Sequence, residues 1–245
     1  MRDQRGGAGR LDGRTRRRLA LLGVFQPRCT ARRLAPDSPA GTTLPPELLL
    51  MLLMSPCGSI FLYQGEELGL PQANVPFDQL RDPEAIANWP ITLGRDAART
   101  PMPWCNDSRQ AGFSEGEPWL PVDARHLPLA IDLQASDSKS PLHFTRKPIA
   151  LRRVIPALRH GAFAVSVATR SLLAFERSDG NARDICVFNF GDRPVSLEDS
   201  SLVEVLLTAD SDGRDTSSLP PMNGLIAELA PNVEETGSGR PRSLS

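Results

Sequence analysis

The sequence has few cysteines, histidines and lysines, and these shortages exclude several kinds of site. The four cysteines are widely spaced and form no Cys-x-x-Cys pair, which argues against a disulfide framework or a zinc site. The three histidines also lie far apart, without the spacing of metal ligands. We therefore expect no bound metal, no cofactor and a reducing, cytoplasmic location.

Long hydrophobic runs and a strong net charge are also missing. No apolar stretch reaches 18 residues, so we predict no transmembrane helix. The formal net charge of −1 gives no reason to expect a nucleic-acid or membrane partner. With 245 residues, 40% of them hydrophobic, the chain is long enough for one or two domains with a sizeable core.

Residues 1–43 are rich in arginine and glycine, and we predict a disordered arm there. Three alternatives stay open. Arg16, Arg17 and Arg18, followed by an apolar patch, faintly suggest a twin-arginine signal. A basic arm for nucleic acid is conceivable but lacks a set of stacking aromatics. The third alternative is off-frame translation of a GC-rich gene, or a wrong start, which the upstream nucleotides in the other two frames would test. The polar residues 233–245 predict a frayed tail.

The segment that follows the arm contains a predicted helix and a predicted strand. Residues 44–55 are apolar on nearly all sides and begin with two prolines, which suit the first turn of a buried helix. Residues 59–63 form an apolar run without alternation, which is typical of a strand buried on both faces of a parallel sheet. Further along, residues 82–88 predict a short helix, and residues 141–161 predict a helix that Gly161 caps.

From residue 162 the pattern changes to short β-like runs separated by turn residues. This rhythm is typical of an antiparallel sandwich. The predicted strands are residues 163–169, 171–177, 185–190, 195–197, 202–208 and 225–229.

Four motifs follow one another between residues 63 and 122, within the longer stretch 48–229 over which the sequence resembles a known family. They read YQGEELGLPQ, RDAARTPMPW, AGF and PWLPV, and begin at Tyr63, Arg95, Ala111 and Pro118. In this order they resemble the α-glucosidase and oligo-1,6-glucosidase branch of the α-amylase superfamily, glycoside hydrolase family 13. The resemblance implies an α/β plus all-β fold. Residues 44–161 would be the C-terminal part of a (β/α)8 barrel, with 59–63 as its eighth strand, and residues 162–232 would form a C-terminal antiparallel β-sandwich.

The resemblance implies retaining hydrolysis of terminal α-linked glucose, with a maltose- or isomaltose-type oligosaccharide as substrate. That reaction requires two carboxyl groups flanking the bond. In the family these groups follow strands four and five, and a stabilising aspartate belongs to an Asn-His-Asp motif after strand seven. This sequence contains none of the three segments. We therefore assign no catalytic residue and expect a truncated, inactive C-terminal fragment, with a non-catalytic carbohydrate-binding or accessory module as the alternative.

The remaining site residues are carried over from the matching motifs. Arg99 would pair with an absent aspartate and grip the non-reducing glucose, because a guanidinium presents a rigid fork of donors. Arg95 and Asp96 would lie nearby in the same pocket. Gln64, Glu66 and Glu67 would support the pocket, because neighbouring residues are poorly placed to flank one bond. For Arg99 the alternative is a salt bridge that anchors a loop.

Several aromatic residues are further candidates for contact with sugar. Trp89, Trp104 and Trp119 suit stacking on sugar rings, although Trp104 in its proline turn also suits packing, and Phe113 can be interpreted in the same two ways. Acidic residues such as Glu115 are interpreted as solvated.

Overall fold

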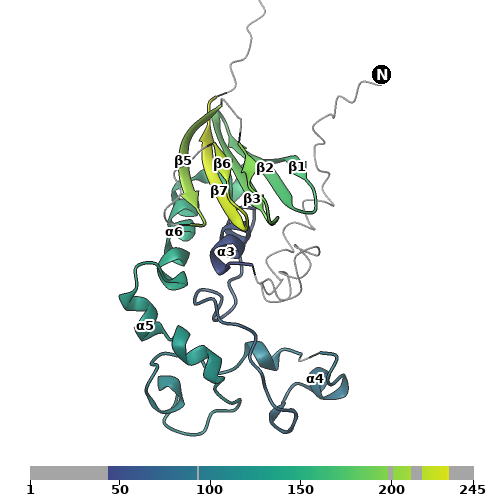
Figure 1. Cartoon of the computed structure of the whole chain (residues 1–245), viewed down its shortest axis with the longest axis vertical. Helices are drawn as coiled ribbons and strands as arrows, with labels where there is room; N and C mark the ends of the chain where they lie inside the picture. Colours follow the sequence, from purple (N-terminus) through teal and green to yellow (C-terminus); the bar gives the residue numbers. More distant parts are fainter. Residues whose placement is uncertain (1–43, 93, 198–200, 211–216, 232–245) are drawn as a thin grey trace, which may run out of the picture.

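The structure is a computed structural model and describes residues 44–92, 94–197, 201–210 and 217–231. The predicted arm 1–43 and tail 233–245 lie outside the described residues. An antiparallel sheet forms one end of the molecule, and α3 (Pro46–Met54) and α6 (Pro141–Val154) lie beside it (Figure 1). The other end consists mainly of loops, with the short helices α4 (Pro83–Ala87) and α5 (Ile131–Ser136) among them. None of the described helices is long and apolar enough to cross a membrane.

The helix expected at residues 44–55 is confirmed as α3. Pro46 is its first residue, where the missing N–H has no helical partner in any case. Its leucines and methionines are buried on nearly every side because the helix lies between α6 and the sheet. Just past its end, the Ser55 hydroxyl donates to the Met51 carbonyl oxygen at 2.6 Å.

The helix expected at residues 141–161 is two helices. α6 ends at Val154, and α7 (Pro156–His160) begins after an extended residue, Ile155. Proline restricts the residue before it to extended backbone, so Pro156 ends the first helix at that point. Gly161 is the C-cap of α7, as expected, but its φ of −61° is not left-handed.

The β-region is antiparallel throughout its described residues. The five-stranded sheet has the order β1-β2-β3-β7-β5, and β4 pairs with β6 in a second, two-stranded sheet. The six predicted strands are all present; β6 was not predicted. The strands are β1 (Ala162–Ala168), β2 (Leu172–Asp179), β3 (Ala182–Asn189), β4 (Val195–Ser196), β5 (Leu202–Thr208), β6 (Ser218–Leu219) and β7 (Asn223–Leu229).

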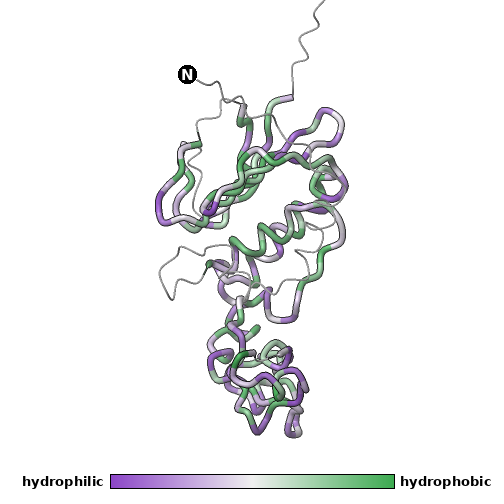
Figure 2. The backbone as a smooth tube through the Cα atoms, turned by 90° about the vertical axis from the view of Figure 1, so that its right-hand side faces the viewer, coloured by the Kyte–Doolittle hydropathy of each residue, from purple (hydrophilic) through white to green (hydrophobic). Residues whose placement is uncertain are grey.

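The larger sheet is covered on both faces. One face packs phenylalanines such as Phe175 and Phe188 against Leu48 and Met51 of α3. The other face packs against Leu219 of β6. Figure 2 shows the hydrophobic parts of the sheet and of the helix layer facing each other. One hydrophobic core contains residues of the helices and of the sheet, and so extends across the predicted boundary at residue 161. The domain boundaries at residues 161 and 232 stay predictions.

The strand expected at residues 59–63 is wrong for this structure. The segment forms no strand, and Phe61, Leu62 and Tyr63 are 68%, 36% and 38% exposed. A strand exists only when neighbours satisfy its backbone groups. The described residues offer no such neighbour here, because their sheets contain only β1 to β7.

Asp184 on β3 carries a predicted pH dependence of stability. Burial, together with the nearby Glu228, raises its pKa from 3.8 to about 6, although Arg177 opposes the shift. The folded state therefore holds the proton more tightly, so stability from this group is greatest below pH 3.8 and falls as the pH rises to about 6.

We therefore expect Asp184→Asn to raise the free energy of unfolding by about 1–2 kcal/mol at pH 7 and by almost nothing at pH 4. Urea denaturation of both proteins at the two pH values measures this difference, and other titrating groups cancel in the comparison. An equal effect at both pH values would show that Asp184 is not protonated more readily in the folded state.

Candidate functional site

The turn after residue 63 brings two of the predicted site segments together. The Gln64 side-chain amide donates to the carbonyl oxygen of Thr100 at 3.1 Å, so Gln64 lies beside the residue that follows Arg99. The Tyr63 N–H donates to the Glu66 carboxylate at 3.0 Å. These two bonds fold the YQGEELG turn back on itself and hold it against the RDAARTPMPW loop.

Glu66 and Glu67 both lie in this turn, in different surroundings. Glu66 is 7% exposed and faces its own turn. Glu67 has one buried carboxylate oxygen without a hydrogen-bond partner, and its carbonyl accepts from the Thr145 hydroxyl at 3.3 Å. Their supporting role in a sugar pocket stays a prediction.

Asp96 is completely buried and organises the loop from beneath. One carboxylate oxygen accepts from the Arg81 N–H at 2.6 Å and from the Asp82 N–H at 2.7 Å. Asp82 in turn caps α4 by accepting from the Glu84 N–H and also accepts from the Arg95 N–H at 2.7 Å. These backbone donors lower the pKa of Asp82. The sequence Asp82-Pro83 predicted the start of this helix, but the hydrogen bond from the Arg95 N–H to the Asp82 carboxylate was not predicted.

Arg95 and Arg99 stand on the outside of this loop. Both side chains are exposed, and neither guanidinium group makes a hydrogen bond or an ion pair within the described residues. The Arg99 alternative, a loop-anchoring salt bridge, is therefore not formed here. Asp96 holds the turn, whereas the two arginine side chains lie at the surface, and the part of all three in a sugar pocket stays a prediction.

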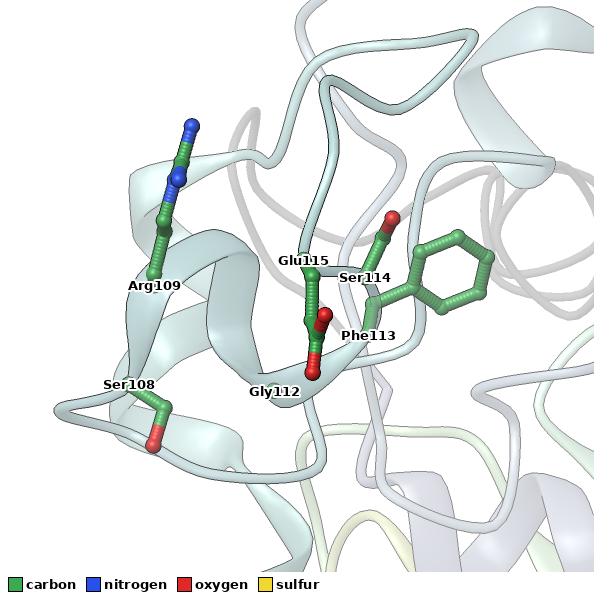
Figure 3. Close-up of a pocket in the computed structure, with 6 residues that line it drawn as sticks. All are labelled: Ser108, Arg109, Gly112, Phe113, Ser114 and Glu115. Carbon is green, nitrogen blue, oxygen red and sulfur yellow. The ribbon is translucent and has the colours of Figure 1, made fainter.

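A hollow of about 570 Å³ lies farther along the same loop (Figure 3). Its lining combines an aromatic ring, a guanidinium, a carboxylate and two hydroxyls. Its described lining contains one carboxyl group, whereas glycoside cleavage uses two. The lining residues are Ser108, Arg109, Gly112, Phe113, Ser114 and Glu115.

Three candidate metal ligands lie within 4.8 Å of one another: Cys105, Asp107 and Asp132. Their atoms are already used to close the loop. The Cys105 thiol donates to Asp107 at 3.3 Å, and Asp132 accepts from the N–H groups of Asn106 and Leu133. Hydrogen bonding to the two carboxylates contributes to a raised pKa of Cys105, because it favours the protonated thiol.

The exposed aromatics are partly available for stacking. Trp104, Phe113 and Trp119 are 52%, 49% and 67% exposed, so none of them is a fully buried packing anchor. Trp89 lies against Phe77, with ring centroids 5.7 Å apart.

Comparison with known proteins identifies the family to which this fold and these loops belong. A family model described as "Alpha amylase, catalytic domain" matches residues 31–161, more than half of the chain. The chain belongs to this family, and the resemblance drawn from its motifs is confirmed. The described part of the chain is thus a part of an α-amylase-type catalytic domain, with helices followed by an antiparallel sheet.

Its relatives include α-glucosidases. A probable alpha-glucosidase of Rhizobium meliloti is 42% identical over 152 residues, which are 62% of this chain and 27% of the relative. An oligo-1,6-glucosidase of Parageobacillus thermoglucosidasius is 28% identical over 56% of this chain and 27% of its own length. The chain therefore spans about a quarter of these curated relatives.

Solved structures show the same partial coverage. The alpha-glucosyl transfer enzyme XgtA superposes with a TM-score of 0.69 at 33% identity, covering 82% of this chain and 38% of XgtA. A MutB variant in complex with the substrate sucrose superposes with a TM-score of 0.65 at 26% identity, covering 75% of this chain and 38% of MutB.

Proposed function

We propose that this chain supplies the C-terminal part of an α-glucosidase, an enzyme that releases terminal α-linked glucose from short oligosaccharides with retention. The observation that carries the proposal is its similarity to glucosidases over the loops that hold Arg99. The nucleophile and the general acid come from a portion of the catalytic domain outside this sequence. A cytoplasmic location belongs to the same proposal and rests on the free thiols of Cys57, Cys105 and Cys186.

In this proposal Arg99 binds the non-reducing glucose together with an aspartate of the missing portion. Its exposed guanidinium has no hydrogen-bond or ion-pair partner among the described residues, so binding a carboxylate or hydroxyls breaks no bond to them. Arg95 lies beside it, and Asp96 and Gln64 hold the loop in place. The sugar is of the maltose or isomaltose type, and MutB complexes with sucrose and isomaltulose make a disaccharide a reasonable size.

The exposed segment 59–63 provides the junction with the missing portion. In a strand its apolar side chains would alternate to two faces. Residues 59–62 have no backbone hydrogen bond within the described residues, whereas the N–H and the carbonyl of Tyr63 already bond to Glu66. Inserted between two parallel strands, the segment becomes the strand that its sequence favours. Amide hydrogen exchange at residues 60–62 is then fast in the chain alone and slow in the assembled enzyme.

Complementation tests the proposal. This chain is co-expressed with the portion of the Rhizobium meliloti relative that precedes its aligned region, and hydrolysis of a chromogenic α-glucoside is measured. We expect no turnover from either piece alone and clear turnover from the pair. Arg99→Lys should lower kcat/KM of the pair by about 10- to 100-fold, because lysine lacks the bidentate fork. Arg146→Lys, on the exposed side of α6, should leave it unchanged.

Two outcomes contradict the proposal. Turnover by the purified chain alone would show that its own residues include the catalytic pair. Restored activity that is insensitive to Arg99 would remove the arginine from the glucose site.

A further inference from the structure

The hollow at residues 108–115 has the chemistry of a site for a neutral, polyhydroxylated ligand. It offers one positive group, Arg109, and one negative group, Glu115, so it has no net attraction for an anion or a cation. Sugar hydroxyls both donate and accept, and this pair supplies acceptors and donors to match. The Phe113 ring adds a flat apolar surface for the C–H face of a pyranose.

Of the polar groups that line the hollow, the two charged ones have no partner among the described residues, whereas one hydroxyl is already in use. Neither Arg109 nor Glu115 forms a hydrogen bond or an ion pair within the described part of the chain. Phe113 is half exposed and has no aromatic neighbour among the described residues. Ser114 is partly used, because its hydroxyl accepts from the Gly116 N–H at 3.1 Å.

The backbone of the site is held in an unusual conformation. Gln110 and Ala111 have φ values of 50° and 55°, in the left-handed region that non-glycine residues rarely occupy, and Gly112 follows at 68°. Each such non-glycine residue costs about 1–2 kcal/mol. The N–H groups of Trp104 and Cys105 both donate to the Ala111 carbonyl, at 2.9 and 3.0 Å, and fix the turn. The site is therefore preformed, and strain of this kind is concentrated at functional positions.

The geometry assigns a carbohydrate-binding site to this turn, with Phe113, Arg109 and Glu115 as its contacts. Figure 3 shows the Arg109 side chain and the Phe113 ring on opposite sides of Glu115, so a ligand that touches all three extends across the turn. A volume of about 570 Å³ suits a disaccharide. The choice of an α-linked glucose disaccharide as ligand rests on the proposed function. The assignment of a carbohydrate-binding site does not rest on it, because the site needs no catalytic acid and all its lining residues belong to this chain.

Isothermal titration of the full chain with maltose and with isomaltose tests this site. We expect saturable binding of at least one of them in the millimolar range, with no turnover. Phe113→Ala should weaken binding by about 3- to 10-fold, the contribution of one aromatic contact. Glu115→Gln should weaken it as well, because the amide accepts fewer hydrogen bonds. The matched control is Phe77→Ala, which removes an equally exposed phenylalanine outside the hollow.

The other possible results of the titrations each support or contradict the proposed sugar site. Glucose 6-phosphate should bind no better than maltose, because the positive charge of Arg109 is offset by the negative charge of Glu115. Tighter binding would overturn the assignment of a neutral ligand. Binding that Phe113→Ala and Glu115→Gln leave unchanged, or that Phe77→Ala abolishes, would place the sugar elsewhere. The absence of saturable binding would overturn the site. If Phe113→Ala fails to fold, Arg109→Gln replaces it. Since complementation measures turnover at Arg99, either result stands without the other.

Discussion

Replacing Arg152 by methionine is expected to lower the free energy of unfolding by about 3–4 kcal/mol. One guanidinium nitrogen lies 2.8 Å from the carbonyl oxygens of Met54 and Pro56 and 2.6 Å from that of Leu158. The other lies 2.7 Å from the carbonyl oxygen of Gly58. A single side chain thus ties the end of α3, the start of segment 59–63 and the end of α7 together.

The size of the effect follows from what methionine leaves behind. Its length preserves the apolar packing of the side chain, but four carbonyl groups, two in α3 and α7 and two in the loop after α3, lose this donor. Hydrogen bonds from a charged donor contribute about 1.5–3 kcal/mol each, but the partial burial of Arg152 reduces the net value. Burial also lowers the pKa of Arg152, which shows that the charge is partly desolvated.

Chemical denaturation of Arg152→Met, Arg152→Lys and Arg153→Met separates the donor network from charge alone. Arg153 is the next residue on the same helix but is exposed, so its replacement should change stability by less than about 0.5 kcal/mol. Lysine at position 152 keeps the charge but reaches fewer carbonyls and should recover part of the loss. If all three variants unfold at the same denaturant concentration, the carbonyl network contributes nothing measurable.

The elements that were predicted well from the sequence are those whose ends are marked by residues in or next to the element itself. Pro46 opens α3, Asp82 caps α4, and turn residues separate the strands, so each of these signals is local. Pro156 was also a local signal, and it divides the region 141–161 where one helix had been expected. β6 has only two residues, too few to produce a pattern.

What the sequence could not give depends on contacts between distant residues. Segment 59–63 has the composition of a buried strand, but pairing is a property of its neighbours, and in this chain it stays exposed. Arg152 reaches carbonyls 94 to 98 residues away. Glu115 is exposed, as expected of a solvated acid, but its place in a hollow with Arg109 depends on the turn at Gln110 and Ala111. The motifs located the Arg99 loop, whereas Asp96 was revealed as its buried support only by the fold.

Replacing Gly161 by alanine is expected to lower the free energy of unfolding by at least about 3 kcal/mol, for a reason that differs from the usual one at a helix end. Its φ of −61° and ψ of 167° are allowed for alanine, so backbone torsion gives no penalty. A Cβ atom there would lie 2.5 Å from the Ser178 carbonyl oxygen and 2.6 Å from that of Ala157. Both contacts are with backbone, which has no rotamer to move aside, so α7 and β2 must separate.

Gly180, in the turn between β2 and β3, is the matched control because its situation is the reverse. Its φ is +59°, but a Cβ atom would meet nothing within 4 Å. Gly180→Ala should therefore cost about 1 kcal/mol, the cost of a left-handed alanine alone. Thermal or urea denaturation of both variants compares crowding with torsion in one protein. A larger loss of stability at Gly180 than at Gly161 would mean that α7 moves away from β2 at little cost. The junction between the helices and the sheet would then be looser than the close approach of Ala157 and Ser178 to Gly161 indicates.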